Sequence, residues 1–244
     1  MKNLKFVIFL FAFGLVGGYF TSLYSIEIMD TTLLEEAVAQ VGSIENVILI
    51  STVQSLLYAV VLGLIGKILS EKIGLWREFA FESRSLIYTV IASLVGGALL
   101  IFPDLFVFGK FIPPVLDSYA SKPTLNYIIA SVAYGGVIEE VMLRLFLMSL
   151  IALIISKLSK DKTATDKHFV IANVVSALLF AIGHLPATVQ SIGISPIIII
   201  RCIIMNGAFG LLFGRMYRKH GIGYAMLTHA GVHIVSKLIW ILFI

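Results

Sequence analysis

Two adjacent glutamates and an arginine lie in the middle of a long apolar stretch. Glu139, Glu140 and Arg144 fall within residues 125–155, a run long enough to cross a membrane. A charge at the bilayer centre costs roughly 3 kcal/mol on insertion scales, so such groups usually have a function. Glu140 and Arg144 are four residues apart, which favours an ion pair on one helix face. Glu139 points about 100° away and stays free to take a proton. The pattern indicates a chemical or transport role, because a purely structural ion pair would leave Glu139 without a function.

The last apolar stretch carries three polar residues on one helical stripe. His229, His233 and Lys237 are spaced at i, i+4 and i+8, so they face the same side of a helix. Two histidines four apart match the spacing of a zinc helix, but Ala230 stands where H-E-x-x-H needs its glutamate. A metal such as zinc, held by histidines of different helices with Glu139, therefore stays open beside a metal-free site. We expect the ammonium of Lys237 to extend to the outer membrane surface, and the guanidinium of Arg201 to do the same.

A free glutamate, histidines and an arginine-paired second glutamate are the parts of a hydrolase that activates water. Glu139 would act as general base, and a histidine would bind the water or donate to the oxyanion. His184 ends the string FAIGH, and a lone histidine at such a place is more often a hydrogen-bonded interfacial residue. No serine, cysteine or aspartate pair is arranged for covalent or aspartyl catalysis. The same groups suit a proton relay, so a proton- or ion-coupled transporter is the alternative class.

The composition is that of an integral membrane protein. Of 244 residues, 59% are hydrophobic and 13% are charged, whereas soluble domains carry about 25% charge. The net charge of +4 does not imply nucleic acid, because basic residues in a membrane protein mainly set its orientation. The single cysteine, Cys202, excludes an internal disulfide and a cysteine-based zinc site. We therefore predict an all-α, polytopic helix bundle in the lipid bilayer, with residues 1–244 forming one domain.

The apolar stretches predict about seven transmembrane helices, or eight if an interfacial helix is counted. Helices are expected to end at Pro103 and at Pro186. We expect residues 215–220 to form a short basic turn and residues 25–45 to form an acidic outer loop. The predicted spans are residues 6–20, 47–65, 86–102, 125–155, 169–185, 196–214 and 222–244.

The distribution of basic residues indicates how the chain crosses the membrane. Most lysines and arginines fall in segments that face inward if the N-terminus is cytoplasmic, and the expected outer loops hold only Lys110 and Lys122. We expect a multi-pass protein of a prokaryotic cell membrane with a cytoplasmic N-terminus. If its helix starts at residue 169, His184 lies ~10 Å closer to the outer membrane surface than Glu139 and His229 do. A helix start near Thr165 or Asp166 would remove this conflict in depth.

Three short motifs follow one another in the later membrane stretches. They are E-E-x-x-x-R at Glu139 to Arg144, F-x-x-x-H at Phe180 to His184, and H-x-x-x at His229 to His233. In this order they resemble the CAAX-protease and bacteriocin-processing (CPBP or Abi) family of intramembrane endopeptidases. The resemblance covers roughly residues 125–235, and we expect a catalytic core of about 125–244.

The resemblance implies a role for each motif residue. Glu139, His184 and His229 would activate water for hydrolysis of a peptide bond, while Glu140 and Arg144 would support the site. Members of the family are often labelled metalloproteases, although a glutamate-activated water without metal is also argued for the prenyl proteases.

One position departs from the family pattern. The residue four after the last motif histidine is usually asparagine or aspartate, a candidate oxyanion donor, and here it is His233. A histidine can also donate a hydrogen bond, so the resemblance implies an endopeptidase whose substrate is a peptide or protein, prenylated or hydrophobic. CAAX-type processing and bacteriocin maturation or self-immunity both stay open. A catalytically inactive family member that acts as a scaffold is the further alternative.

Overall fold

Long helices make up most of the chain. The computed structural model describes residues 2–160 and 162–244, apart from the side chains of residues 2 and 3, and none of these residues forms a strand. Seven helical stretches among the described residues are long and apolar enough to cross a membrane, which confirms the predicted fold class. The chain is therefore a multi-pass integral membrane protein. The stretches are Leu4–Ile28, Ile44–Lys72, Ser83–Lys110, Leu125–Leu158, Asp166–Ile192, Pro196–His220 and Ile222–Phe243.

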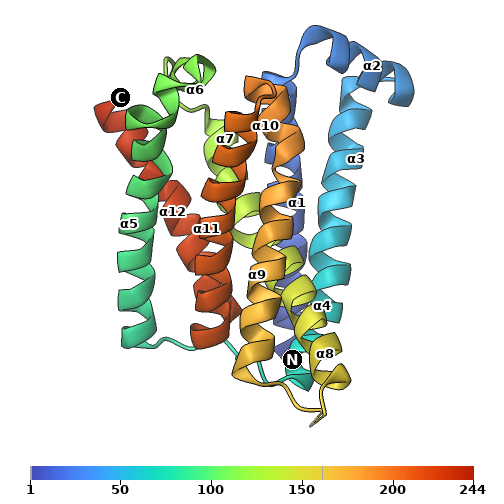
Figure 1. The fold of residues 1–244 in the computed structure, drawn as a ribbon. Helices are drawn as coiled ribbons and strands as arrows, with labels where there is room; N and C mark the ends of the chain where they lie inside the picture. The colour runs from blue at the N-terminus through green and yellow to red at the C-terminus, as the bar shows by residue number, and fades with distance from the viewer. Residues whose placement is uncertain (1, 161) are drawn as a thin grey trace.

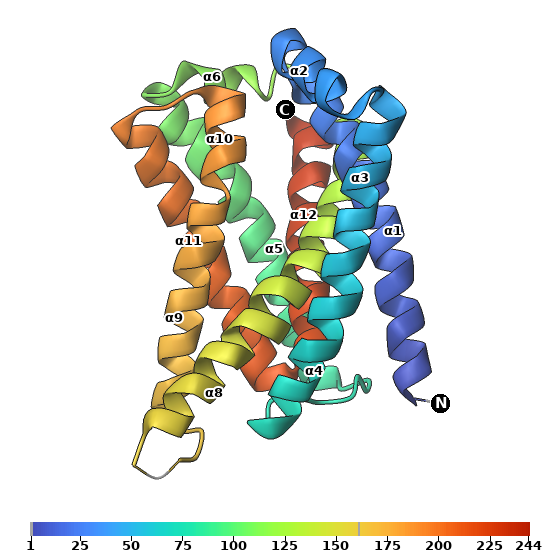
Figure 2. The same cartoon turned by 90° about the vertical axis from the view of Figure 1, so that its right-hand side faces the viewer.

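The long helices run side by side, and the two chain ends lie at opposite ends of the bundle (Figure 1). The short helices α2 (Thr31–Val41), α6 (Pro113–Asp117) and α10 (Leu185–Ile192) gather at the end that holds the C-terminus, as Figure 2 also shows. The other helices are α1 (Lys2–Ile28), α3 (Ile44–Leu57), α4 (Gly63–Lys72), α5 (Ser83–Phe106), α7 (Leu125–Ala130), α8 (Ser149–Leu158), α9 (Asp166–Gly183), α11 (Pro196–His220) and α12 (Ile222–Phe243). A π-helical turn, Tyr58–Leu62, joins α3 to α4, and a 3₁₀ turn, Phe108–Lys110, follows α5.

The spanning stretch that carries the two glutamates is not a regular α-helix. Between α7 and α8 it contains two π-helical segments, Ser131–Glu139 and Val141–Met148, on either side of Glu140. Their i→i+5 hydrogen bonds widen the helix, and π turns are rare and frequent at functional sites. The predicted angle of about 100° between neighbouring side chains, which assumes an α-helix, therefore does not hold here.

Close helix contacts depend on glycines. A Cβ added at Gly97 of α5 would lie 2.4 Å from Cγ1 of Val235 and 3.0 Å from the backbone nitrogen of Ser236, both on α12. A Cβ at Gly136 would lie 2.7 Å from the Cβ of Ala230, also on α12. These two glycines let α5 and the π-helical stretch approach the two sides of α12. The site helix is thereby held against the helix that carries His229.

Of the two helix ends predicted at prolines, the one at Pro103 is wrong. Helix α5 continues through Pro103 to Phe106, and the carbonyl of Pro103 accepts a hydrogen bond from the N–H of Val107 at 3.0 Å. The proline lacks only its own N–H in the last turn, so the helix persists. Helix α9 ends at Gly183, before Pro186, which lies in the first turn of α10, where a proline is tolerated.

Two predicted loops also contain helices. Residues 215–220 continue α11 up to His220, and the chain turns at Gly221, whose φ of 92° favours glycine. The basic residues in that last turn complement the helix dipole. In the acidic loop, α2 forms because Oδ1 of Asp30 accepts a hydrogen bond from the N–H of Leu33 at 3.0 Å. Short polar helices of this kind lack the apolar pattern on which the predicted spans depend.

The start of α9 agrees with the depth argument from the sequence. The helix begins at Asp166 after the cap residue Thr165, whose N–H donates to Nδ1 of His168 at 3.2 Å. Its 18 residues place His184 ~27 Å along the helix axis from Asp166. His184 thereby reaches the level of Glu139.

We expect Gly97→Ala to lower the free energy of unfolding by about 1–3 kcal/mol, because the new methyl group overlaps Val235 and the α12 backbone. The matched control is Gly207→Ala within α11, where the nearest atom is 3.9 Å away. That variant should be neutral or slightly stabilising through helix propensity. Thermal unfolding in detergent measures both, and equal shifts would contradict the packing account.

Candidate functional site

A buried ion pair lies at the centre of the bundle. Glu140 and Arg144 have no exposed side-chain surface, and Oε2 of the glutamate lies 3.6 Å from Nε of the arginine. The other carboxylate oxygen, Oε1, lies 3.0 Å from Nδ1 of His229 on α12. Glu140 therefore connects the π-helical stretch to α12, and the predicted pairing with Arg144 is present.

Aromatic rings surround the guanidinium of Arg144. Its Cζ lies 4.8 Å from the centre of the Phe180 ring and 5.9 Å from that of Phe213, within the range of cation–π attraction. The Phe213 ring also stacks on the imidazole of His229, with centres 4.0 Å apart. Sequence reasoning missed Phe213, and its only signal is its aromatic type within an apolar run. Phe180 and Phe213 hold the arginine and His229 in fixed positions.

Glu139 faces a different partner from its neighbour. Its Oε1 lies 3.9 Å from Nε2 of His184, and the two side chains are 19% and 33% exposed. Nδ1 of His184 lies 2.8 Å from the carbonyl oxygen of Phe180 and donates to it, so Nε2 is the nitrogen directed at Glu139. The pair comes from two elements, the π-helical stretch and the end of α9. One glutamate is thus enclosed, while the other is partly exposed.

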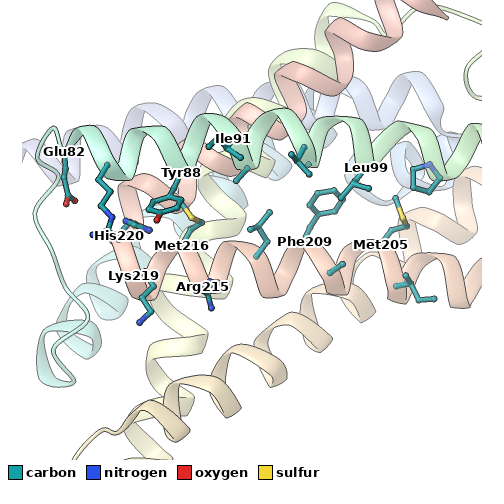
Figure 3. Close-up of a pocket in the computed structure, with 18 of the residues that line it drawn as sticks. Glu82, Tyr88, Ile91, Leu99, Met205, Phe209, Arg215, Met216, Lys219 and His220 are labelled. Carbon is teal, nitrogen blue, oxygen red and sulfur yellow. The ribbon is translucent and has the colours of Figure 1, made fainter.

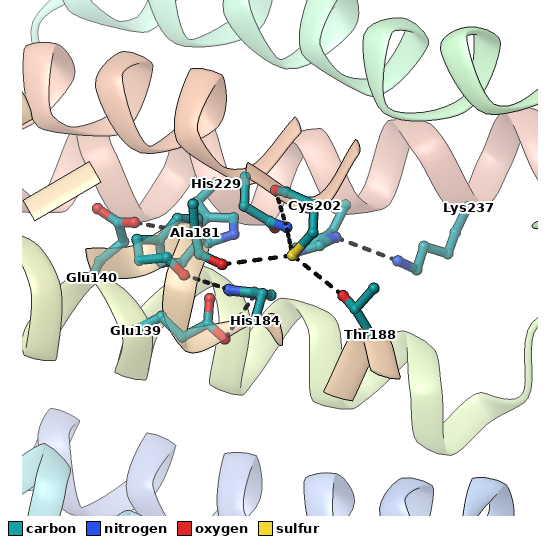
Figure 4. A network of polar contacts seen from close by, with 11 residues as sticks. Glu139, Glu140, Ala181, His184, Thr188, Cys202, His229 and Lys237 are labelled. Atoms are coloured by element: carbon teal, nitrogen blue, oxygen red, sulfur yellow. Dashed lines mark hydrogen bonds and ion pairs between the residues drawn. The ribbon is translucent and has the colours of Figure 1, made fainter. Parts of the chain in front are cut away.

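Phe180 links the two parts of the site. Its ring centre lies 4.5 Å from the imidazole of His184 and 6.1 Å from that of His229. Figure 4 shows Glu139 and His184 together, with Glu140 and His229 beside them. The F-x-x-x-H motif therefore places an aromatic ring between the two histidines.

The stripe on α12 continues away from Glu140. The imidazoles of His229 and His233 stack with centres 5.0 Å apart, and Nδ1 of His233 lies 3.3 Å from Nζ of Lys237. Lys237 is only 4% exposed, so the expectation that it extends to the membrane surface is wrong. Its side chain instead turns into the bundle over the ring of Tyr127, 4.1 Å from the ring centre.

A second ion pair, partly buried, was not predicted. Arg201, expected to extend to the surface like Lys237, pairs with Asp104 of α5, and its Nε donates to Oδ1 at 2.7 Å. The hydroxyl of Tyr119 donates to Oδ2 of the same aspartate at 3.1 Å. Burial, and then the charge of Asp104, raises the pKa of the Tyr119 hydroxyl. An aspartate directly after Pro103 in an apolar run was the signal available for this pair.

The described residues do not form a metal site. Among residues 2–160 and 162–244, no group of three or more His, Cys, Asp or Glu side chains is placed to hold a metal ion. Nδ1 of His229 is engaged by Glu140 and Nδ1 of His184 by a backbone carbonyl, which leaves Nε2 of each ring for other partners. The arrangement fits a water held by protein groups.

A large cavity lies elsewhere in the bundle. It has a volume of about 940 Å³, and its walls come mainly from α5 and α11 (Figure 3). Phe209 lines it, and the ring of Phe209 stacks on that of Phe213 with centres 5.9 Å apart. The described lining includes none of the six predicted site residues. The cavity is therefore separate from the cluster around Glu139 and Glu140.

Comparison with protein families identifies the class. Residues 121–235 match the family described as Rce1-like, type II CAAX prenyl endopeptidase Rce1-like. This segment, slightly under half of the chain, therefore carries an Rce1-like domain, and the family's description is that of an endopeptidase. The matched segment contains all six predicted site residues, whereas Lys237 lies beyond its end. No curated protein and no solved structure showed a significant match to the chain.

We expect Arg144→Met to lower the free energy of unfolding by about 3–5 kcal/mol, because it leaves the buried charge of Glu140 unpaired. The double variant Glu140→Gln with Arg144→Met removes both charges and should recover part of the loss. Denaturant titration in mixed micelles measures the three proteins. If the double variant is no more stable than the single one, the pair is not electrostatically coupled.

Proposed function

We propose that this chain is an intramembrane endopeptidase that hydrolyses a peptide bond with a water activated by Glu139 and His184. The observation that carries the proposal is the contrast between the adjacent glutamates. Glu140 is fully buried against Arg144 and His229, while Glu139 faces His184 and is 19% exposed. Glu139 is thus the carboxylate that a water and a substrate carbonyl can both reach.

The mechanism follows from the positions of these groups. A water that hydrogen-bonds both Oε1 of Glu139 and Nε2 of His184, which are 3.9 Å apart, is aligned for attack. Glu139 takes one proton as the water oxygen bonds to the carbonyl carbon. The carbon–nitrogen bond then breaks, and the same proton passes to the leaving amine. No covalent bond to the protein is formed.

The oxyanion that forms on the attacked carbonyl requires hydrogen-bond donors on the side away from Glu139 and His184. The nearest imidazoles are those of His229 and His233, whose rings stack on α12 beside Gly135. A hydrogen bond from either ring requires a protonated Nε2, and it strengthens as negative charge develops in a site of low dielectric constant. Glu140 and Arg144 hold His229 in place and do not exchange protons with the substrate.

The family suggests the substrate class. Its description names prenyl endopeptidases of the CAAX type, and we carry that class forward as the proposed activity on a prenylated or hydrophobic peptide. The distribution of basic residues supports a cytoplasmic N-terminus. In that orientation the end of the bundle that holds α4 and α8 faces the cytoplasm (Figure 2).

We expect Glu139→Gln to lower the cleavage rate of a prenylated peptide by on the order of 10²–10⁴, since the amide cannot accept the proton. The control is Glu71→Gln on α4, where the glutamate is 45% exposed and pairs with Lys67 at the surface. That variant should cleave at the wild-type rate. A library of prenylated and unmodified peptides, incubated with detergent-purified protein, provides the assay.

Cleavage that survives in Glu139→Gln would exclude this glutamate as the general base. Added chelator should leave the wild-type rate unchanged, because Glu139 and His184 hold the attacking water without a metal in the proposed mechanism. Cleavage of unmodified but not prenylated peptides would retain the hydrolase and reject the CAAX-type substrate.

A further inference from the structure

Lys237 is a buried cation that the proposed mechanism does not use. It is 4% exposed, and its Nζ lies 4.1 Å from the centre of the Tyr127 ring. No carboxylate among residues 2–160 and 162–244 forms an ion pair with it. A buried charge without a counter-ion is destabilising, so stability alone does not explain the residue.

The contact between Lys237 and His233 determines where the imidazole proton lies. While Lys237 is an ammonium it has donors only, so Nδ1 of His233, 3.3 Å from Nζ, then accepts. In a neutral imidazole the proton then lies on Nε2. His229 has the opposite arrangement, because its Nδ1 faces the carboxylate of Glu140 at 3.0 Å and must donate to it. The two stacked rings therefore hold opposite tautomers.

Both Nε2 atoms face the same place above the π-helical stretch. A Cβ built on Gly135 would lie 3.1 Å from Nε2 of His233 and 3.8 Å from Nε2 of His229. Because Gly135 has no side chain, the two imidazoles can approach the backbone of the π-helical stretch this closely. His233 presents an N–H there, and His229 presents a lone pair while it is neutral.

We propose that Lys237 is a positioning residue that keeps the proton of His233 on Nε2, so that this nitrogen donates to the oxyanion. The inference rests on the proposed function. It explains how His233 can donate to the oxyanion at a position where the family usually has asparagine or aspartate. An amide presents an N–H whatever its neighbours, whereas an imidazole needs a fixed tautomer.

A double-mutant comparison tests this role. Lys237→Met should lower kcat roughly 10- to 100-fold with little change in KM, the range seen when a supporting hydrogen bond is removed. Lys237→Arg should retain most of the activity, because a guanidinium also has donors only. In the His233→Asn background, Lys237→Met should lower kcat by less than about twofold, since the asparagine amide needs no partner to fix a tautomer. Lys110→Met, at an exposed lysine, is the control for loss of a positive charge.

An equal loss of kcat from Lys237→Met in the wild-type and His233→Asn backgrounds would contradict the proposal, because Lys237 would then have only a structural role. Nitrogen-15 spectra of labelled histidine give an independent test that needs no substrate. Nε2 of His233 should resonate as a protonated nitrogen and Nδ1 as an unprotonated one, and the reverse would overturn the proposal. If the wild-type protein shows no cleavage that depends on Glu139, the proposed function is rejected. The spectra would still decide which nitrogen of His233 carries the proton.

A separate observation concerns the cavity between α5 and α11. Its walls are apolar and face outward, with Ile91, Val95 and Leu99 of α5 each more than half exposed. Figure 3 shows Phe209 and Met205 of α11 opposite Leu99. A volume of about 940 Å³ is in the range of ligand sites, which run from about 300 to 1,000 Å³. The groove suits a hydrocarbon chain lying along the helices.

One end of this groove is basic. Arg77, Arg84, Arg215 and Lys219 line it, and all four are exposed. Glu82 is the acidic residue among the described lining, and its carboxylate accepts a hydrogen bond from Ser85. The positive charges therefore outnumber the negative ones at the end of an apolar groove. That combination matches a lipid with an anionic phosphate headgroup.

We infer that this groove binds an anionic glycerophospholipid, with its phosphate at the basic end and an acyl chain between α5 and α11. Native mass spectrometry of detergent-purified protein with phosphatidylglycerol or phosphatidylcholine measures the retained lipid. Phosphatidylglycerol should be retained about tenfold better. Replacing Arg84, Arg215 and Lys219 by glutamine should remove that preference.

The matched control replaces Lys157, Lys160 and Lys167 by glutamine, which removes the same charge from another basic segment. It should keep the preference for phosphatidylglycerol. Ala208→Phe, at an exposed position on the groove wall, should lower retention of both lipids. Equal loss in the two triple variants would mean general attraction to basic protein, and unchanged retention in Ala208→Phe would place the acyl chain elsewhere. Either result would overturn the inference.

Discussion

The charge of Arg144 is held inside an apolar helix bundle, with none of its side chain exposed. An unpaired charge in such a place costs several kcal/mol, so its neighbours must compensate for it. Glu140 provides the opposite charge, and Phe180 and Phe213 provide ring faces. The second oxygen of Glu140 then binds His229. Arg144 thus fixes how α9, α11 and α12 meet the π-helical stretch.

The same constraint separates the roles of two neighbouring glutamates. Because Glu140 is committed to Arg144 and His229, Glu139 is the carboxylate left to face His184. The wide π-helical turns place the two carboxylates in different surroundings although they are adjacent in sequence. We infer that the enclosed glutamate organises the site and the accessible one does the chemistry.

Much of the site could be predicted from local spacing. The four-residue separation of Glu140 and Arg144 predicted their ion pair, and the spacing of His229 and His233 predicted a shared face. The predicted span began at residue 169, but the depth of His184 indicated that a start near Thr165 or Asp166 would fit better, and α9 begins at Asp166. These features depend on one helix at a time, or on helix length, and a sequence shows both directly.

The missed features all depend on contacts between distant helices. Lys237 and Arg201 were expected at the surface, since nothing in the sequence shows that Tyr127 and Asp104 lie beside them. Phe213 has the same apolar pattern as any core residue, yet it stacks on His229. The π-helical segments have no local sequence signal that we recognised.

The most direct test of the account is whether water itself attacks the peptide bond. Purified protein would cleave a susceptible peptide in ¹⁸O-enriched water with hydroxylamine present, and mass spectrometry would examine the new C-terminus. We predict one ¹⁸O atom in the new carboxylate and no hydroxamate. Hydroxamate formation would reveal a covalent acyl intermediate and contradict the role given to Glu139 and His184.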